Sequence, residues 1–217
     1  MERDSLTNSS RVVVKFGTGI LTNRSKQIDP GQIEQLVAQV AAQRQAGREV
    51  VVVTSGAVGG GMGALGMTQR PAELSDLQAC AAVGQLKLMA AYSELFAKHD
   101  LQVAQVLLTH DDLEHRERHL NARNTLVSLL DKGVVPIVNE NDAVADDEIR
   151  FGDNDRIAAL VAHLVEADLL VLLTDTPGLF TADPRLDAGA SLIEEIVEID
   201  HELEHLAGGT GTDRGSG

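Results

Sequence analysis

The chain has 217 residues, enough for one large domain or two small ones, and 43% of them are hydrophobic, as in an ordinary globular core. A formal net charge of −15 argues against nucleic acid or an anionic membrane surface as the main partner. The single cysteine, Cys80, excludes an internal disulfide and favours a cytoplasmic location, and no apolar run reaches the length of a membrane span.

Apolar runs and amphipathic stretches alternate along the chain. The first ten residues are polar and indicate a disordered tail. Strands are predicted over Arg11–Phe16, Glu49–Thr54, Leu101–Thr109, Val134–Val138 and Leu169–Leu173. Helical spacing predicts helices over Pro30–Ala46, about Ser75–His99, Leu113–Asp131 and Ile157–Val165. This alternation predicts βαβ units and an α/β fold with a mainly parallel sheet, which suits a core of aliphatic residues with only 2% aromatics.

Polar or glycine clusters follow four of the predicted strands. They are Lys15–Gly17, Thr54–Gly56, Asn139–Asp142 and Thr174–Asp175. Because ligands of open parallel sheets bind at the carboxyl ends of the strands, this recurrence predicts a binding site at one edge of the sheet.

Lys15 precedes the glycine turn Gly17-Thr18-Gly19. A lysine there can reach phosphate oxygens while the glycines allow close backbone approach, but a lysine extending from a strand end to solvent fits the pattern equally well.

The segment Ser55–Gly63 is rich in glycine and follows the second strand. Such a loop can present backbone N–H groups to an anion, or it can be a flexible turn in which Ser55 caps a helix. It matches neither G-x-x-x-x-G-K-[ST] nor G-x-G-x-x-G, so those two nucleotide motifs are not supported.

Seven carboxylates fall within Glu140–Asp155, and F-G-D-N-D-R (Phe151–Arg156) directly precedes a predicted helix. Any one of Asp153, Asn154 and Asp155 is most simply explained as a cap or first-turn residue. Together with the other strand-end clusters, all three favour a binding site. Most of the remaining acidic excess is expected to be solvated surface.

Two histidine pairs have the i, i+4 spacing of metal ligands. His115 with His119 and His201 with His205 each lie among charged residues, as solvated helix faces do, and such spacing is common by chance. We predict no metal site in the protein itself.

Six segments resemble the amino acid kinase family, in its order and spacing, from about Arg11 to the end of the chain. They are V-V-V-K-F-G-T-G, V-V-V-T-S-G-A-V, L-N-A-R-N-T-L, V-P-I-V-N-E-N-D-A-V, F-G-D-N-D-R-I-A-A-L and L-L-T-D-T-P-G-L-F-T-A-D-P-R. The resemblance implies a three-layer α/β/α sandwich over residues 11–217. Residues from about 11 to 165 would hold glutamate, and those from about 166 to 217 would begin the nucleotide-binding part.

The resemblance also implies an activity. It is the ATP-dependent phosphorylation of the side-chain carboxylate of L-glutamate, with Mg²⁺ carried by ATP, as the first step of proline biosynthesis. Carried over by motif, Lys15 and Asp155 would be catalytic, Lys15 contacting the transferring phosphoryl group and Asp155 organising the catalytic lysines. The glutamate would be bound by Ser55, Asp142 and Asn154. The nucleotide would be bordered by Lys15, Gly17, Thr174, Asp175, Ser216 and Gly217, with the loop Thr181–Arg185 nearby. A homo-oligomer and feedback inhibition by proline are further implications.

Two departures from the family pattern stand out. Gly19 occupies a position that is often serine, and the chain ends at Ser216-Gly217, where the family motif continues G-M-x-T-K. We therefore expect a truncated kinase that binds glutamate better than it turns over ATP and carries no RNA-binding-like C-terminal domain. Alternatives are a relative acting on acetylglutamate, aspartate, carbamate or a nucleoside monophosphate, and a non-catalytic glutamate sensor.

Overall fold

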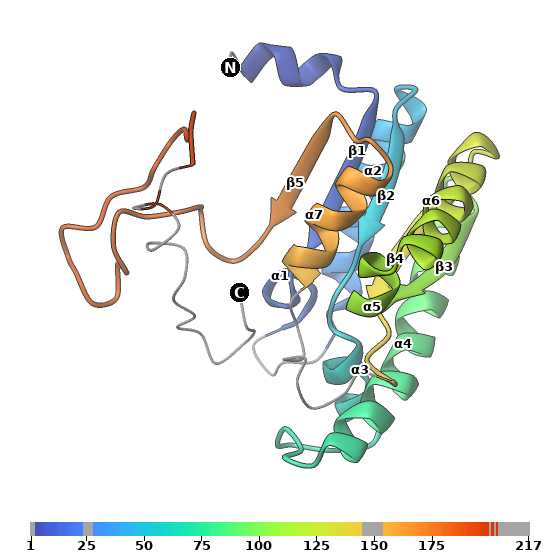
Figure 1. Ribbon diagram of the computed structural model, residues 1–217. Coiled ribbons are helices and arrows are strands. Elements are labelled where there is room, and N and C mark those ends of the chain that lie inside the picture. Colours follow the sequence, from blue (N-terminus) through green and yellow to red (C-terminus); the bar gives the residue numbers. More distant parts are fainter. Residues whose placement is uncertain (1–2, 24–27, 145–153, 200, 202, 204–217) are drawn as a thin grey trace.

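A five-stranded, wholly parallel β-sheet forms the centre of the protein (Figure 1). The computed structural model describes residues 3–23, 28–144, 154–199, 201 and 203. The strand order is β3-β4-β2-β1-β5. The strands are β1 (Arg11–Phe16), β2 (Glu49–Val53), β3 (Val103–Leu108), β4 (Val135–Glu140) and β5 (Leu169–Leu173).

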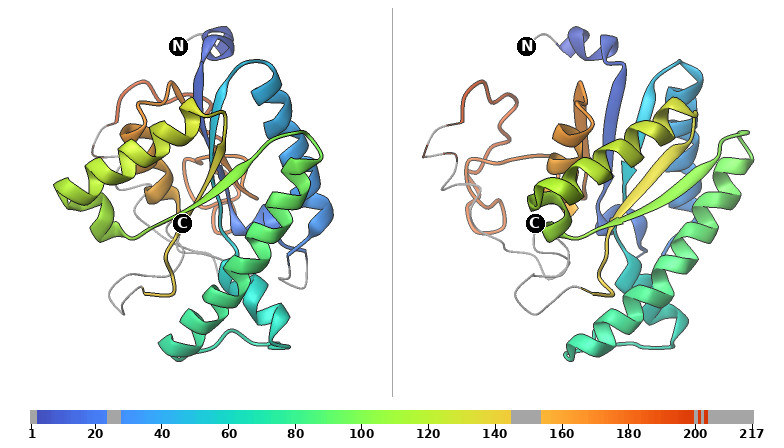
Figure 2. Two further views of the ribbon diagram at one scale, coloured as in Figure 1. Left: turned by 90° about the vertical axis from the view of Figure 1, so that its right-hand side faces the viewer. Right: turned by 45° about the vertical axis from the view of Figure 1, so that its right-hand side comes forward.

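Helices connect the strands and cover both faces of the sheet. They are α1 (Thr18–Leu21), α2 (Pro30–Gln45), α3 (Ala57–Ala64), α4 (Leu74–Ala97), α5 (His110–Glu114), α6 (Arg116–Asp131) and α7 (Asn154–Leu164). Figure 2 shows α2 and α4 together on one side and α6 and α7 on the other. The expected three-layer α/β/α sandwich around a parallel sheet is confirmed.

The alternation of side chains along β2 explains the two hydrophobic cores. Val51 and Val53 point into the core under α5, α6 and α7, while Val50 and Val52 point into the core under α2 and α4. All four are fully buried, because successive residues of a strand face opposite sides and both sides are covered. A run of β-branched residues buried on both faces is what the sequence predicted.

Local sequence signals set the beginning of α2. Asp29 accepts hydrogen bonds from the backbone N–H groups of Gly31 and Gln32, and Pro30 occupies the first helical position, where its missing N–H costs nothing. The helix begins where the sequence predicted.

Two segments differ from the sequence-based expectation. The predicted helix over Leu113–Asp131 is two helices, α5 and α6, separated at His115, whose backbone is extended. Thr109 and Asp112 form a capping box that begins α5 before the expected start. The glycine-rich segment after β2 is also helical over Ala57–Ala64 rather than an open loop.

At the N-terminus, Arg3–Asn8 forms a 3₁₀-helix where the sequence indicated a loose tail. The guanidinium of Arg48 donates a hydrogen bond to the carbonyl of Thr7 and so ties this helix to the body of the domain. Among the described residues, no helix is long and apolar enough to cross a membrane.

Candidate active site

The polar clusters at the strand ends lie along one edge of the sheet. β4, β2, β1 and β5 are consecutive neighbours and all run parallel, so their carboxyl ends meet at that edge. The amino end of α7 reaches the same edge, since Asn154 contacts the residues that follow β2. The predicted meeting of these residues is confirmed for those that the structure describes.

Lys15 and Asp155 form an ion pair at this edge. The Lys15 Nζ lies 2.6 Å from Asp155 Oδ1, and the lysine side chain is 10% exposed against 42% for the aspartate. A buried ammonium needs such a partner, because removal from water disfavours its charge. The pair fixes a positive charge at the end of β1 with one side of the carboxylate still open to solvent.

Glycines allow the backbone to approach closely around this charge. A Cβ on Gly17 would lie 3.0 Å from the Leu173 carbonyl oxygen and 3.5 Å from the Lys15 Nζ. A Cβ on Gly19 would lie 2.6 Å from Asp175 Oδ2. The turn after β1 therefore lies directly against Thr174 and Asp175, which follow β5. Gly19 stands where the family often has serine, and in this structure the side chain of Asp175 occupies the space that a side chain at position 19 would need.

Asn154 forms the centre of a buried hydrogen-bonded cluster. Its Nδ2 donates to the Thr54 carbonyl and the Ser55 Oγ, both at 3.0 Å, and to Asn139 Oδ1 at 3.1 Å. All four residues are at most 5% exposed. Two of the residues expected to bind glutamate, Ser55 and Asn154, are thus in direct contact.

The cluster continues through two glutamines. Asn139 Nδ2 donates to Gln85 Oε1 at 2.8 Å, and Gln85 Nε2 donates to Gln105 Oε1 at 2.9 Å. Gln85 comes from α4 and Gln105 from β3, so four side-chain amides from four elements form one continuous chain.

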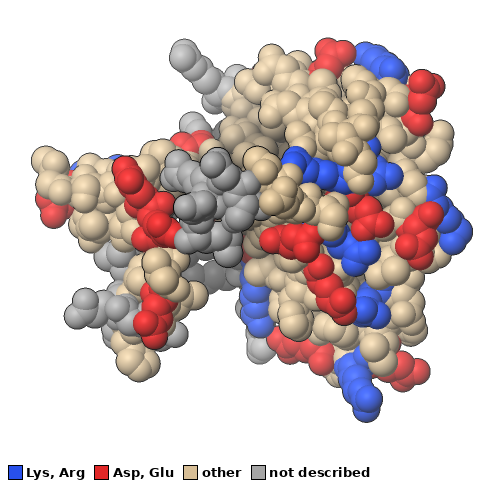
Figure 3. Space-filling model, turned by 90° about the horizontal axis from the view of Figure 1, so that it is seen from above, with Lys and Arg blue, Asp and Glu red and all other residues tan. Residues whose placement is uncertain are grey.

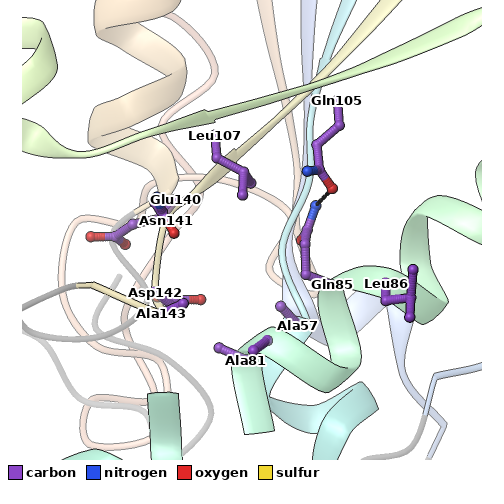
Figure 4. Close-up of a pocket in the computed structure, with 11 residues that line it drawn as sticks. Ala57, Ala81, Gln85, Leu86, Gln105, Leu107, Glu140, Asn141, Asp142 and Ala143 are labelled. Carbon is purple, nitrogen blue, oxygen red and sulfur yellow. Dashed lines mark hydrogen bonds between the residues drawn. The ribbon is translucent and has the colours of Figure 1, made fainter. Parts of the chain in front are cut away.

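A cavity of about 270 Å³ lies beside this row of hydrogen-bonded amides. Figure 4 shows the Gln85–Gln105 bond on one side and the segment from Glu140 to Ala143 on the other. The third residue expected to bind glutamate, Asp142, lines this cavity, and burial raises its pKa to about 6, against the lowering effect of Arg70. Ionising this carboxylate is costly without a ligand in the cavity, and the charge of a cationic ligand would offset that cost.

Glu140 supplies a second carboxylate to the cavity wall, and this one is buried. It is 3% exposed, and its Oε1 lies 4.0 Å from the Nε2 of the buried His110. The α5 helix that begins at His110 therefore contacts the same edge of the sheet.

One glycine of the glycine-rich segment and one of α4 allow close helix packing. A Cβ on Gly61 would lie 1.8 Å from the Cys80 carbonyl oxygen, and one on Gly84 would lie 1.7 Å from the Ala57 carbonyl oxygen. These glycines let α3 and α4 pack backbone against backbone. Gly56 has a φ of 91° and turns the chain from Ser55 into α3.

The remaining predicted residues are placed as follows. Thr181–Arg185 lies in the segment after β5, where Arg185 pairs with Asp183. Ser216, Gly217 and the acidic residues 146–148 and 153 lie outside the described residues. On the face seen in Figure 3, acidic and basic side chains are intermixed, as expected of solvated surface.

No group of three or more potential metal ligands occurs among the described residues, and His205 of the second histidine pair lies outside them. The Nδ1 atoms of His115 and His119 hydrogen-bond the backbone carbonyls of Asp111 and Leu113, both in α5.

Sequence reasoning missed Gln85 and Gln105. They lie 20 positions apart, on a helix and an edge strand, and no local motif joins them. Asn139 was noted only as part of a strand-end cluster. Its place directly after the apolar run of β4 was the available signal.

Comparison with known proteins agrees with this geometry. The model of the amino acid kinase family matches residues 10–213. The chain is 54% identical over 210 residues to a glutamate 5-kinase of Azoarcus sp. (strain BH72), covering 97% of this chain and 57% of that protein. Glutamate 5-kinases of Burkholderia mallei (strain SAVP1) and Burkholderia pseudomallei (strain K96243) are each 54% identical over 215 residues, covering 99% of this chain and 58% of theirs. The chain thus spans somewhat more than half the length of these curated relatives. The parallel sheet and the paired lysine, glycine turn and buried amide cluster at its strand ends agree with these matches. The match over residues 10–213 shows that the chain belongs to the amino acid kinase family.

Proposed function

We propose that the chain carries the kinase site of a glutamate 5-kinase, which transfers the γ-phosphoryl group of ATP to the side-chain carboxylate of L-glutamate. The observation that carries the proposal is the adjacency, in sequence and in space, of two groups. Asp155 pairs with Lys15, and the preceding residue Asn154 contacts Ser55. The name and the 54% identity of the relatives add support.

The transfer needs charge and positioning more than acid–base catalysis. The acceptor carboxylate is ionised near pH 7, so no general base has to remove a proton. A carboxylate oxygen forms a bond to the γ-phosphorus, the bond from that phosphorus to the bridging oxygen breaks, and ADP leaves. The main difficulty is bringing two anions together.

Lys15 would supply the positive charge for this step. Its ammonium lies at the end of β1, 3.5 Å from the place of a Cβ on Gly17, and the missing side chain would leave room for phosphate oxygens. Asp155 would hold the lysine in place through the 2.6 Å ion pair.

The glutamate would lie toward β2 and β4. Asp142 would pair with the α-ammonium group, and Ser55 and Asn154 would bind its polar groups without adding charge. An acetylated amino group or a phosphate would gain nothing from Asp142, so this residue favours a substrate with a free amino group over an acetylated amino acid or a phosphate.

The nucleotide would lie toward β5, in the part of the chain from about residue 166. Gly17, Thr174 and Asp175 meet there, and the loop Thr181–Arg185 follows. Mg²⁺ bound to ATP would neutralise part of the phosphate charge.

A hydroxamate-trapping assay tests the function. MgATP and hydroxylamine are supplied with glutamate, aspartate or N-acetylglutamate, using both the chain and the full product of its reading frame. The proposal expects hydroxamate only with glutamate. Product with N-acetylglutamate or aspartate instead would reassign the substrate, and measurable glutamate binding without product from either protein would favour a sensor.

Assembly and regulation complete the proposal. We expect a homo-oligomer, measurable by light scattering, and inhibition of the hydroxamate reaction by proline. Both expectations rest on the family resemblance.

A further inference from the structure

We propose that Gln85 is a positioning residue that orients Asn154 to accept a hydrogen bond from the α-ammonium of the substrate. The proposal rests on the proposed function and assigns a role to the amide chain Gln105–Gln85–Asn139–Asn154, here called the amide relay.

The hydrogen bonds of the relay all run in one direction. Asn154 donates to Asn139, Asn139 donates to Gln85, and Gln85 donates to Gln105. Each amide therefore uses its nitrogen toward Gln105 and its oxygen toward Asn154. The four dipoles align, and the negative end of the array is the Asn154 Oδ1.

That terminal oxygen is buried and has no hydrogen-bond partner among the described residues. Asn154 is 4% exposed, and three acceptors share the two hydrogens of its Nδ2. A buried acceptor without a donor costs free energy, so its presence points to a donor supplied by a ligand. Donation by the Asn154 amide nitrogen also strengthens its carbonyl oxygen as an acceptor, because hydrogen bonds in a chain polarise one another.

Gln85 links this oxygen to the cavity. It lines the same cavity as Asp142, it is 8% exposed, and its Oε1 accepts the bond that fixes the orientation of Asn139. Without that acceptor, the Asn139 amide is free to turn over and offer its NH₂ to Asn154. The Asn154 NH₂ would then face a second NH₂ in place of an acceptor across a 3.1 Å contact, and the repulsion favours turning the Asn154 amide over as well. An ammonium would meet donors instead of an acceptor.

A cycle of two ligands and two proteins tests the role. Calorimetry compares L-glutamate with glutarate, which lacks only the α-amino group, and the affinity ratio measures what that group contributes. In Gln85→Met, a change of similar length that suits a helix, we expect this ratio to fall by about tenfold, of the order of one hydrogen bond to a charged group. The steady-state counterpart is a raised KM for glutamate with kcat nearly unchanged.

Gln39→Met is the matched control, because Gln39 is an exposed glutamine of α2 away from the cavity. It should leave the ratio unchanged. Gln85→Glu keeps an acceptor oxygen facing Asn139 and should retain the ratio, since the exposed Gln105 can turn its amide to donate. This variant also decides the question if Gln85→Met does not fold.

Each outcome has one meaning. A ratio unchanged in Gln85→Met overturns the relay, as does an equal loss of affinity for both ligands, which would indicate a merely structural role. A ratio lost in Gln85→Glu also overturns it. If the unmodified protein does not bind glutamate at all, the proposed function fails first, and the two failures are therefore distinguishable.

Discussion

Lys15 and Asp155 form a pair with unequal exposure, the lysine being largely buried and the aspartate partly open. The ammonium is held by one carboxylate at the end of β1. A Cβ on the neighbouring Gly17 would lie 3.5 Å from the Lys15 Nζ, so the glycine leaves space beside the ammonium. At this scale the site is an ion-paired lysine beside an uncharged amide cluster, and the proposed function places the phosphoryl donor at the lysine and the amino acid at the amides.

Replacing Lys15 with methionine removes this charge while keeping most of the side-chain volume. We expect kcat in the hydroxamate assay to fall by about 10²-fold or more, because a positioned cationic donor acts where charge develops in transfer. Glutamate affinity should change by only a few-fold. Lys87→Met, on the exposed side of α4, is the control and should change neither quantity. A kcat within a few-fold of the unmodified protein would contradict the role given to Lys15.

The charged form of Asp142 should lower the stability of the fold while it strengthens the binding of glutamate. Its pKa is raised from 3.8 to about 6, so the folded state holds this proton more tightly than the unfolded state, and the contribution to stability falls as pH rises through that interval. Asp142→Asn removes the cost of the buried charge. Near pH 7 we expect the variant's free energy of unfolding, measured by denaturant titration, to exceed that of the unmodified protein by about 1 to 3 kcal/mol. Below about pH 4 the two free energies should be equal.

The same substitution should weaken glutamate binding by at least about tenfold, since the partner of the ammonium is lost. In the unmodified protein, glutamate affinity should decline as pH falls below about 6. An affinity that is flat from pH 7 to 5 would show that Asp142 does not meet a cation.

The contact between α3 and α4 determines the site at the level of elements. Gly61 and Gly84 let the two helices touch through their backbones, and α3 begins directly after Ser55 and Gly56. Because Gln85 follows Gly84, the same contact also positions one end of the amide relay. Small residues in this segment serve helix packing, and through it the geometry of the substrate side.

Gly84→Ala tests this packing. The added Cβ would lie 1.7 Å from the Ala57 carbonyl oxygen, so the helices must separate, and we expect a loss of about 1 to 3 kcal/mol in stability together with weaker glutamate binding. Gly31→Ala in the first turn of α2 is the control, because its Cβ would meet its nearest atom at 3.4 Å. The control should be neutral or slightly stabilising. Equal behaviour of the two variants in unfolding experiments would refute the packing argument.

Across the whole molecule, the architecture was predictable because strands buried on both faces have continuous runs of Val, Ile and Leu in the sequence. β1, β2 and β5 appear almost at their predicted bounds for this reason. The helix α3 was missed, since glycine has low helical propensity and only tertiary contact with α4 offsets it. The early start of α5 could have been found from Thr109 and Asp112, which have capping-box spacing.

The site was predictable where it follows strand ends and not where it depends on contacts between distant elements. Lys15, Ser55 and Asn154 come together because parallel strands end at one edge. Gln85 and Gln105 join them only once α4 lies across β3 and β4, which no local pattern encodes.

Isotope transfer tests the central claim most directly. Glutamate labelled with ¹⁸O in its side-chain carboxylate is incubated with MgATP and hydroxylamine, using the chain and the full product of its reading frame. If the carboxylate oxygen attacks the γ-phosphorus, hydroxylamine then displaces phosphate at the acyl carbon, and the released phosphate carries one ¹⁸O. The account predicts that label in phosphate formed in step with hydroxamate. Phosphate without label from both proteins would mean that water, and not the substrate carboxylate, accepts the phosphoryl group, and would contradict it.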